Sequence, residues 1–248
     1  MFTVDSLTER DIAKAIDHSL LRPELDDAFV DDGCRLALEY DVASVCVRPA
    51  DVMRAAAILA GSDVAVGTTI GFPHGNHRTE TKVFEAKQAL ADGATELDMV
   101  IEIGALKSGR DADVQADIAE VVEVAHAAGA IVKVIFENAY LTDDEKIRAC
   151  RLSEAAGADF VKPSTGFAPG GATHDDLRLM RANTSPHIGV KAAGGVRTLD
   201  ALLEVMALGT TRIGATATKT ILDEFRVRKE GGAPAPRDEA SSSPNAGY

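Results

Sequence analysis

Eight short apolar segments, most of them followed by a helical pattern, recur along the chain. The segments span residues 15–20, 43–47, 64–70, 96–101, 131–136, 158–162, 188–191 and 211–214. Short apolar runs are typical of strands in a parallel sheet whose two faces are both covered. The alternation of such strands with helices therefore predicts a parallel α/β fold.

The intervening helical patterns are clearest at residues 80–91, 113–128, 143–156 and 199–207. Periodicity alone does not separate a closed (β/α)8 barrel from an open doubly wound sheet. Eight units in a chain of 248 residues favour the barrel, because such barrels commonly use about 250 residues. We expect one barrel domain over residues 1–228. Residues 229–248 are expected to form a disordered, flexible C-terminal tail, because they are rich in small, polar and proline residues.

Charge and cysteine content narrow the functional classes. The chain has 39 acidic and 26 basic residues, a net charge of −13, and this argues against a nucleic-acid partner. Cys34, Cys46 and Cys150 are odd in number and widely spaced, which indicates a reducing compartment without a disulfide framework or a zinc motif. We see no secretory signal and no apolar stretch long enough to cross a membrane, and we expect a soluble, cytoplasmic protein.

Two strands are predicted to end in a lysine. Lys162 closes the strand in the segment 157–167, and Lys191 closes the next strand, in the segment 187–197. Burial disfavours the charged form of lysine, so a strand-end lysine is a candidate nucleophile. Strands separated by one helix are neighbours in a parallel barrel, so we expect each lysine to help lower the pKa of the other.

Short motifs in a fixed order carry a resemblance to a known family. They are IDHSLL at 16–21, IGFP at 70–73, TE at 79–80, KVFEAK at 82–87, ELDMV at 96–100, IGALK at 103–107, the two lysine segments, and RIGA at 212–215. Together they resemble the deoxyribose-phosphate aldolases, a family of class I, Schiff-base aldolases. The ordered match covers nearly the whole chain, from about residue 12 to about residue 225, and it implies a TIM barrel.

The resemblance implies a reversible aldol reaction. Lys162 would form an imine with open-chain 2-deoxy-D-ribose 5-phosphate, and the reaction would release D-glyceraldehyde 3-phosphate and acetaldehyde. Asp98 would move a proton, acting through water, and Lys191 would keep Lys162 deprotonated. No metal and no cofactor is needed, because the imine supplies the electrophile. The expected partners are small phosphorylated sugars and aldehydes; a homodimer is considered, but the sequence leaves the oligomeric state open.

Side chains alternate along a strand, and this places further charged residues inside the barrel. Asp98 shares a strand face with Glu96, whereas Leu97 and Met99 lie on the opposite, apolar face. This contrast between a polar and an apolar face indicates that Asp98 points inward. The alternative is an Asp that merely pairs with a nearby lysine. We interpret Lys133 as a deeper, structural ion-pair member. Asp17 and Cys46 are expected to line the pocket floor, with Cys46 as a small filler rather than a reactive thiol.

Two glycine-containing turns at 193–198 and 214–218 suggest a phosphate site. Each turn follows a strand and precedes a helix, so backbone N–H groups and the helix dipole can receive an anion. Ordinary turns, which glycine also serves, are the alternative. The residues expected to bind the phosphate are Gly166, Gly194, Gly195, Arg197, Gly214, Ala215 and Thr216.

Some positions depart from the pattern of the family. Pro163 stands where threonine is usual, Arg48 stands where asparagine is common, and the loop 74–78 carries His74, His77 and Arg78. These changes leave open a related Schiff-base aldolase with another phosphorylated or longer substrate, or a barrel that binds a sugar phosphate without catalysis.

The chain ends in a tyrosine, Tyr248. Some family members carry a C-terminal tyrosine that reaches the active site, and Tyr248 matches that placement. An end without a role is the alternative.

Overall fold

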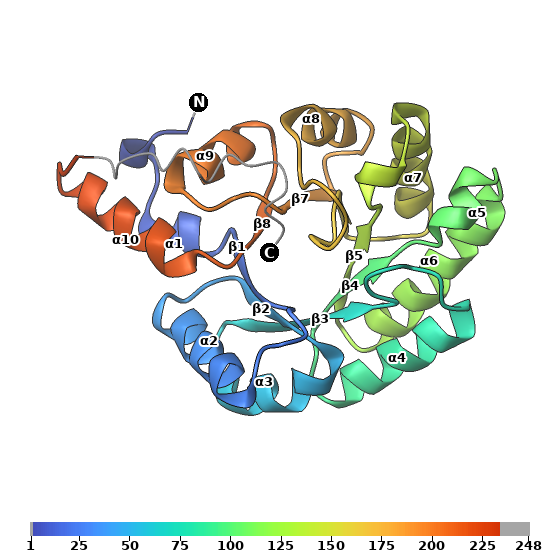
Figure 1. The fold of residues 1–248 in the computed structure, drawn as a ribbon, viewed down its shortest axis with the longest axis horizontal. Helices are drawn as coiled ribbons and strands as arrows, with labels where there is room; N and C mark the ends of the chain where they lie inside the picture. The colour runs from blue at the N-terminus through green and yellow to red at the C-terminus, as the bar shows by residue number, and fades with distance from the viewer. Residues whose placement is uncertain (1, 234–248) are drawn as a thin grey trace.

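The eight apolar segments form eight parallel strands that close into a barrel (Figure 1). The computed structural model describes residues 2–233. The strands are β1 (Ile16–Leu20), β2 (Ser44–Val47), β3 (Ala65–Ile70), β4 (Glu96–Val100), β5 (Ile131–Ile135), β6 (Phe160–Lys162), β7 (Gly189–Ala193) and β8 (Arg212–Ala215). Each strand pairs with the next, and β8 pairs with β1 through Ile213 opposite Ile16. The predicted (β/α)8 barrel is confirmed, with strand ends that differ from the expected ones by one or two residues.

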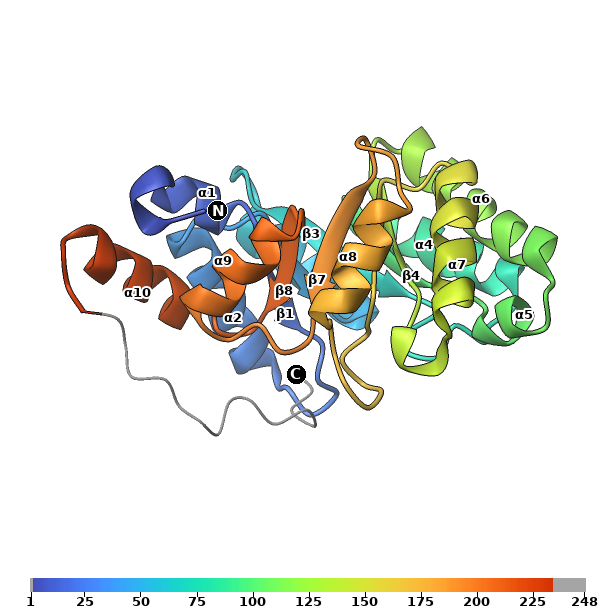
Figure 2. The ribbon, with the colours of Figure 1, turned by 90° about the horizontal axis from the view of Figure 1, so that it is seen from above.

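Helices surround the barrel, and α8 lies alongside β7 (Figure 2). They are α1 (Glu9–Ala13), α2 (Asp27–Glu39), α3 (Val52–Leu59), α4 (Thr79–Ala91), α5 (Ile103–Lys107), α6 (Asp111–Ala127), α7 (Asp143–Ala155), α8 (His174–Ala182), α9 (Leu199–Ala207) and α10 (Thr218–Lys229), with 3-10 turns at Val4–Ser6, Pro49–Asp51 and Asn138–Tyr140. The residues at the start of α7 show why that helix begins at Asp143. The Thr142 hydroxyl accepts from the Glu145 N–H and the Glu145 carboxylate accepts from the Thr142 N–H, which satisfies two backbone donors.

The two ends of the described chain are joined on the outside of the barrel. Arg226 in α10 pairs with Glu9 in α1 at 2.6 Å, and the Lys229 ammonium donates to the Leu7 carbonyl at 2.9 Å. The boundary expected at residue 228 falls in the last turn of α10. Residues 234–248, which include Tyr248 and most of the expected tail, lie outside the described residues.

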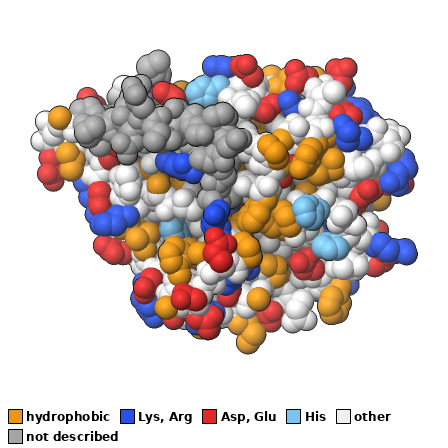
Figure 3. Space-filling view, in the orientation of Figure 1, with side chains coloured by type: hydrophobic (Ala, Val, Ile, Leu, Met, Phe, Trp, Pro, Cys, Tyr) orange, Lys and Arg blue, Asp and Glu red, His pale blue; other side chains and the backbone are white. Residues whose placement is uncertain are grey.

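Charged side chains of both signs lie on the surface of the described residues. On the described part of the face in Figure 3, acidic and basic side chains are mixed. Within residues 2–233, no helix has the length and apolarity needed to cross a membrane.

The packing of Phe160 in β6 requires a glycine at position 189 of the neighbouring strand β7. Phe160 shares its strand face with Lys162 and lies 6.0 Å from the Arg212 guanidinium, measured to the ring centroid. A Cβ at Gly189 would lie 2.2–2.8 Å from three ring atoms of Phe160. No side chain fits at this distance, so the absence of a Cβ at Gly189 leaves room for the aromatic ring.

We therefore expect Gly189→Ala to lower the free energy of unfolding by about 1–3 kcal/mol, because overpacking forces the ring to move. Equilibrium unfolding in urea measures the change. Phe160→Leu in the same background should recover part of the loss, because the smaller side chain removes the clash. Two strictly additive substitutions would show that the ring and position 189 do not compete for space.

Candidate functional site

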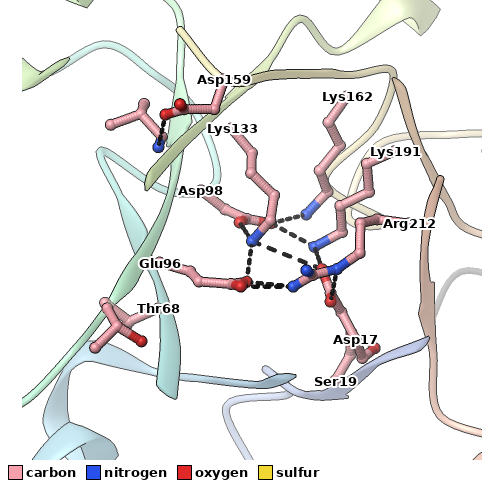
Figure 4. A network of polar contacts seen from close by, with 12 residues as sticks. Asp17, Ser19, Thr68, Glu96, Asp98, Lys133, Asp159, Lys162, Lys191 and Arg212 are labelled. Carbon is pink, nitrogen blue, oxygen red and sulfur yellow. Dashed lines mark hydrogen bonds and ion pairs between the residues drawn. The ribbon is translucent and has the colours of Figure 1, made fainter. Parts of the chain in front are cut away.

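Asp98 lies at the centre of a buried group of charged side chains inside the barrel (Figure 4). Its Oδ2 atom lies 2.8 Å from Lys162 Nζ and 2.7 Å from Lys191 Nζ, and its Oδ1 atom lies 2.9 Å from Lys133 Nζ. The strand register explains the meeting. Asp98 is directly opposite Lys133, and Lys162 lies opposite Ile135, two residues further along β5, so all these side chains face inward.

A second set of contacts lies around Glu96 and Asp17, nearer the N-terminal ends of the strands than Asp98. Lys133 Nζ lies 2.6 Å from a Glu96 carboxylate oxygen, and Arg212 crosses the barrel to reach both oxygens of Glu96, at 2.6 and 2.7 Å. Arg212 Nε also donates to Asp17 Oδ1 at 2.7 Å, while Asp17 Oδ2 lies 2.6 Å from Lys191 Nζ. The carboxylates and the basic side chains thus form one continuous network.

The network contains more basic groups than acidic ones. Its basic side chains are Lys133, Lys162, Lys191 and Arg212, and its carboxylates are Asp17, Glu96 and Asp98. Four positive charges against three negative charges would leave one positive charge unpaired in the interior, where ions are costly. The network is electrically balanced when one of the four basic side chains is neutral.

The surroundings keep most of these groups ionised. Burial alone would raise the pKa of Asp98, but Lys133, Lys162 and Lys191 outweigh it and hold that pKa well below the usual range. Burial would lower the pKa of Lys191, but Asp17 and Asp98 outweigh it and raise that pKa above the usual range.

One expectation from the sequence concerned the effect of the two lysines on each other. Lys162 does act to lower the pKa of Lys191, as predicted, but the two carboxylates have the larger effect, and the pKa rises. The sequence did not place Asp17 and Asp98 on the same ammonium group, so it did not give this net direction. The same holds for Lys133. Burial would lower the pKa of Lys133, but Asp98 and Glu96 outweigh burial and raise it above the usual range.

Cys46 lies in β2 and is buried. Burial, followed by the negative charge of Asp98, raises the pKa of the Cys46 thiol to about 11. The thiol is therefore protonated at neutral pH and fills space, as expected for a small side chain.

The loops that follow β6, β7 and β8 meet at the C-terminal edge of the barrel. The Ala172 N–H donates to the Ala193 carbonyl at 2.9 Å, and Ala193 lies opposite Gly214 of β8. Gly171 and Gly194 pack so closely that a Cβ on Gly171 would lie 2.8 Å from the Gly194 carbonyl oxygen.

The predicted phosphate residues lie in the loops after β6 and β7 and at the end of β8. Gly214 and Ala215 are the last residues of β8 and are buried, and Thr216 follows them. Gly166, Gly194 and Gly195 have φ values of +85°, +82° and +92°, which glycine adopts readily. Arg197 is half-buried and Thr216 is exposed. Tyr248 lies outside the described residues.

Sequence reasoning missed several members of the site. Arg212 and Glu96 were quoted as parts of motifs, but their pairing across the barrel was not foreseen. A charged residue that opens an otherwise apolar strand was the available signal. Glu137 and Thr165, whose contact is described below, gave no signal of their partnership. Within residues 2–233, no three His, Cys, Asp or Glu side chains are grouped so that they could hold a metal ion.

Comparison with known proteins places the chain among aldolases. A sequence model of the DeoC/LacD family of aldolases matches residues 12–222. A deoxyribose-phosphate aldolase from Rhodopirellula baltica is 52% identical over 238 residues, which cover 96% of this chain and 97% of the relative. Another from Bacillus cytotoxicus is 54% identical over 211 residues, which cover 85% of this chain and 94% of the relative.

A solved structure agrees with the sequence comparisons. The tetrameric deoxyribose phosphate aldolase from Aeropyrum pernix is 30% identical, with a TM-score of 0.82 over 88% of this chain and 92% of that chain.

The ionic network makes a prediction about stability. Arg212→Met should lower the free energy of unfolding by about 1–3 kcal/mol, because Glu96 and Asp17 each lose one of their charged hydrogen-bond donors. The double variant Arg212→Met with Glu96→Gln should cost less than the sum of the two single substitutions, since both charges are removed together. Urea unfolding of the four proteins measures the coupling. Additive losses would show that Arg212 and Glu96 do not stabilise each other.

Proposed function

This chain belongs to the DeoC/LacD family of aldolases, which are carbon–carbon lyases, and we propose that it cleaves 2-deoxy-D-ribose 5-phosphate reversibly to D-glyceraldehyde 3-phosphate and acetaldehyde. The proposed route is a Schiff base on Lys162. The supporting observation is the placement of Lys162 at the end of β6, beside an ionised Asp98 that it shares with Lys191.

Charge balance supports Lys162 as the neutral amine of the network. Lys133 contacts three carboxylates, and Lys191 contacts two. The pKa values of Lys133, Lys191 and Arg212 are raised above their usual range, so these three groups stay charged, and Lys162 lies 2.8 Å from the Asp98 oxygen that Lys191 also contacts. Loss of the Lys162 proton would leave three positive and three negative charges inside the barrel, and it would supply the free electron pair that imine formation requires.

Each step can be assigned to these residues. The Lys162 amine attacks C1 of the open-chain sugar, one proton is taken up from solvent, and loss of water gives an iminium ion. A water held by Asp98 and Lys191 takes the proton of the C3 hydroxyl while the C2–C3 bond breaks. The bonding electrons move into the iminium, which becomes an enamine, and glyceraldehyde 3-phosphate leaves. Return of a proton to C2 and hydrolysis then release acetaldehyde and restore Lys162.

The phosphate group is proposed to bind at the end of β8 and at the loops after β6, β7 and β8. Their residues in this role are Gly166, Gly194, Gly195, Arg197, Gly214, Ala215 and Thr216. Support comes from the positive φ values of the first three glycines and from the start of α9 and α10 just after the loops, because helix N-termini attract anions.

Arg48 and Pro163 depart from the family pattern, and both make contacts with neighbouring loops. Arg48 pairs with Asp51 at 2.6 Å and donates to the Leu25 carbonyl at 2.9 Å, so it ties down the loop after β1. Pro163 offers no N–H, but its carbonyl accepts from the Asn138 N–H at 2.8 Å. Neither setting argues for a different reaction.

The remaining parts of the proposal concern the pathway, the compartment and the assembly of the enzyme. We infer a role in deoxyribonucleotide catabolism, in the cytoplasm, with a homodimer as the assembly. Light scattering of the purified protein tests the dimer, and a tetramer or a monomer would contradict it.

The nucleophile can be tested directly. Borohydride reduction of the protein with 2-deoxy-D-ribose 5-phosphate should leave a covalent adduct on Lys162, located by mass spectrometry of the peptides. Lys162→Ala should form no adduct and lose turnover, while its circular dichroism spectrum stays that of the wild type. Lys133→Met serves as a matched control for a buried lysine in the same network. An adduct that persists in Lys162→Ala would assign the nucleophile to another lysine.

A pH profile tests the charge balance. Lys191→Leu removes one positive charge, so the network is balanced only when Lys162 is protonated. We therefore expect the acidic limb of the kcat/KM profile to move to higher pH. Asp17→Asn changes the balance in the opposite sense and should move the same limb to lower pH. Limbs that stay in place, or that move together in one direction, would contradict the proposed balance.

A further inference from the structure

Glu137 adopts an unusual backbone conformation just after β5. Its φ is 58° and its ψ is 65°, a left-handed conformation that costs free energy for residues other than glycine. Its side chain is buried, with the residue only 2% exposed. Such strain persists where the surrounding contacts fix it, and those contacts lie beside Lys162.

The Glu137 carboxylate binds the turn that follows the nucleophile. The Thr165 N–H lies 3.2 and 3.3 Å from the two carboxylate oxygens, and the Thr165 hydroxyl donates to Oε2. The same hydroxyl oxygen accepts from the Phe167 N–H at 3.0 Å. Thr165 therefore links Glu137 to the backbone on both sides of Gly166, one of the residues proposed to bind phosphate.

Backbone bonds on both sides of Glu137 complete the connection. The Phe136 N–H donates to the Lys162 carbonyl at 2.9 Å, and the Asn138 N–H donates to the Pro163 carbonyl at 2.8 Å. Three successive residues of one segment thus hold the chain from Lys162 to Thr165. The Glu137 contact is the last of the three, and it is the one that reaches the turn.

A buried carboxylate is a costly way to stabilise a turn. Its described hydrogen bonds come from the neutral donors of Thr165, and burying a charge with neutral partners is unfavourable for stability alone. A left-handed backbone adds to that cost. Local rules that are broken at one residue are typical of functional sites.

We infer that Glu137 is a positioning residue for the phosphate end of the substrate. It acts through Thr165, fixing the turn over residues 164–167 so that Gly166 is held at the edge where the phosphate is proposed to bind. This inference rests on the proposed function. It assigns Glu137 to the recognition of the phosphorylated substrate and not to the chemistry at Lys162.

The test compares two substrates that differ only in the phosphate. In Glu137→Gln the ratio of kcat/KM for 2-deoxy-D-ribose 5-phosphate to kcat/KM for 2-deoxy-D-ribose should fall about tenfold, the effect of about 1.4 kcal/mol, because one of two acceptor oxygens is lost. Most of the change should lie in KM for the phosphorylated sugar. A ratio equal to that of the wild type, or an equal loss for both sugars, would overturn the inference.

Substitutions at Thr165 test the same contact from the other side. Thr165→Val removes the hydroxyl and should lower the ratio as Glu137→Gln does, whereas Thr165→Ser keeps the hydroxyl and should restore it. The double variant Glu137→Gln with Thr165→Val should be no worse than the more affected single variant, because the two residues act through one contact. Additive losses would overturn the action through Thr165. If Glu137→Gln does not fold, the Thr165 pair alone decides the inference.

A separate measurement distinguishes a failure of the proposed function. Acetaldehyde carries no phosphate, and with borohydride it should leave an adduct on Lys162 of the wild type. A wild type without that adduct overturns the proposed function and this inference with it. A wild type with the adduct, combined with an unchanged substrate ratio in Glu137→Gln, overturns this inference and leaves the proposed function standing.

Discussion

The shared contact of Asp98 with three lysine nitrogens governs the interior of the barrel. A barrel floor filled only with branched apolar side chains would be more stable, because each buried ion loses its hydration. This chain instead places charged residues at inward positions on β1, β4, β5, β6, β7 and β8. Removing Asp98 would take away the one carboxylate that contacts all three lysines, so it would raise the free energy of keeping the lysines charged and buried.

Sequence patterns were sufficient for the barrel and for the residues at its strand ends. Alternation in β4 indicated the inward direction of Asp98, and the end of β6 indicated Lys162. Lys191 was expected to close its strand, but it lies at the middle of β7, which continues to Ala193. The contacts of Arg212 were not predictable in the same way. Asp17 and Arg212 are 195 residues apart and meet because β8 pairs with β1, whereas Glu96 is reached across the barrel. Closure of the sheet, which no local pattern encodes, decides these pairs.

The conformation of Glu137 was also beyond local reasoning. The sequence places Glu137 directly after an apolar strand, at or near an inward position, but nothing in the chain around it signals a left-handed residue. Its direction is set by the turn after β6, which lies 28 residues further on. The same limit applied to the pKa of Lys191, whose direction depends on two carboxylates from distant strands. Local sequence thus locates reactive groups, and tertiary contacts decide their ionisation and aim.

The odd number of charges in the network has a consequence for the timing of the reaction. On the proposed route, the free amine and the enamine leave the interior electrically neutral, whereas each iminium adds one positive charge. Iminium states are therefore the least favourable states in this medium. The electron flow that cleaves the C2–C3 bond neutralises the nitrogen, and the interior loses the excess charge once the proton of the C3 hydroxyl has passed through the water to solvent. The barrel interior would in this way favour passage through the bond-breaking step and disfavour accumulation of the intermediate before it.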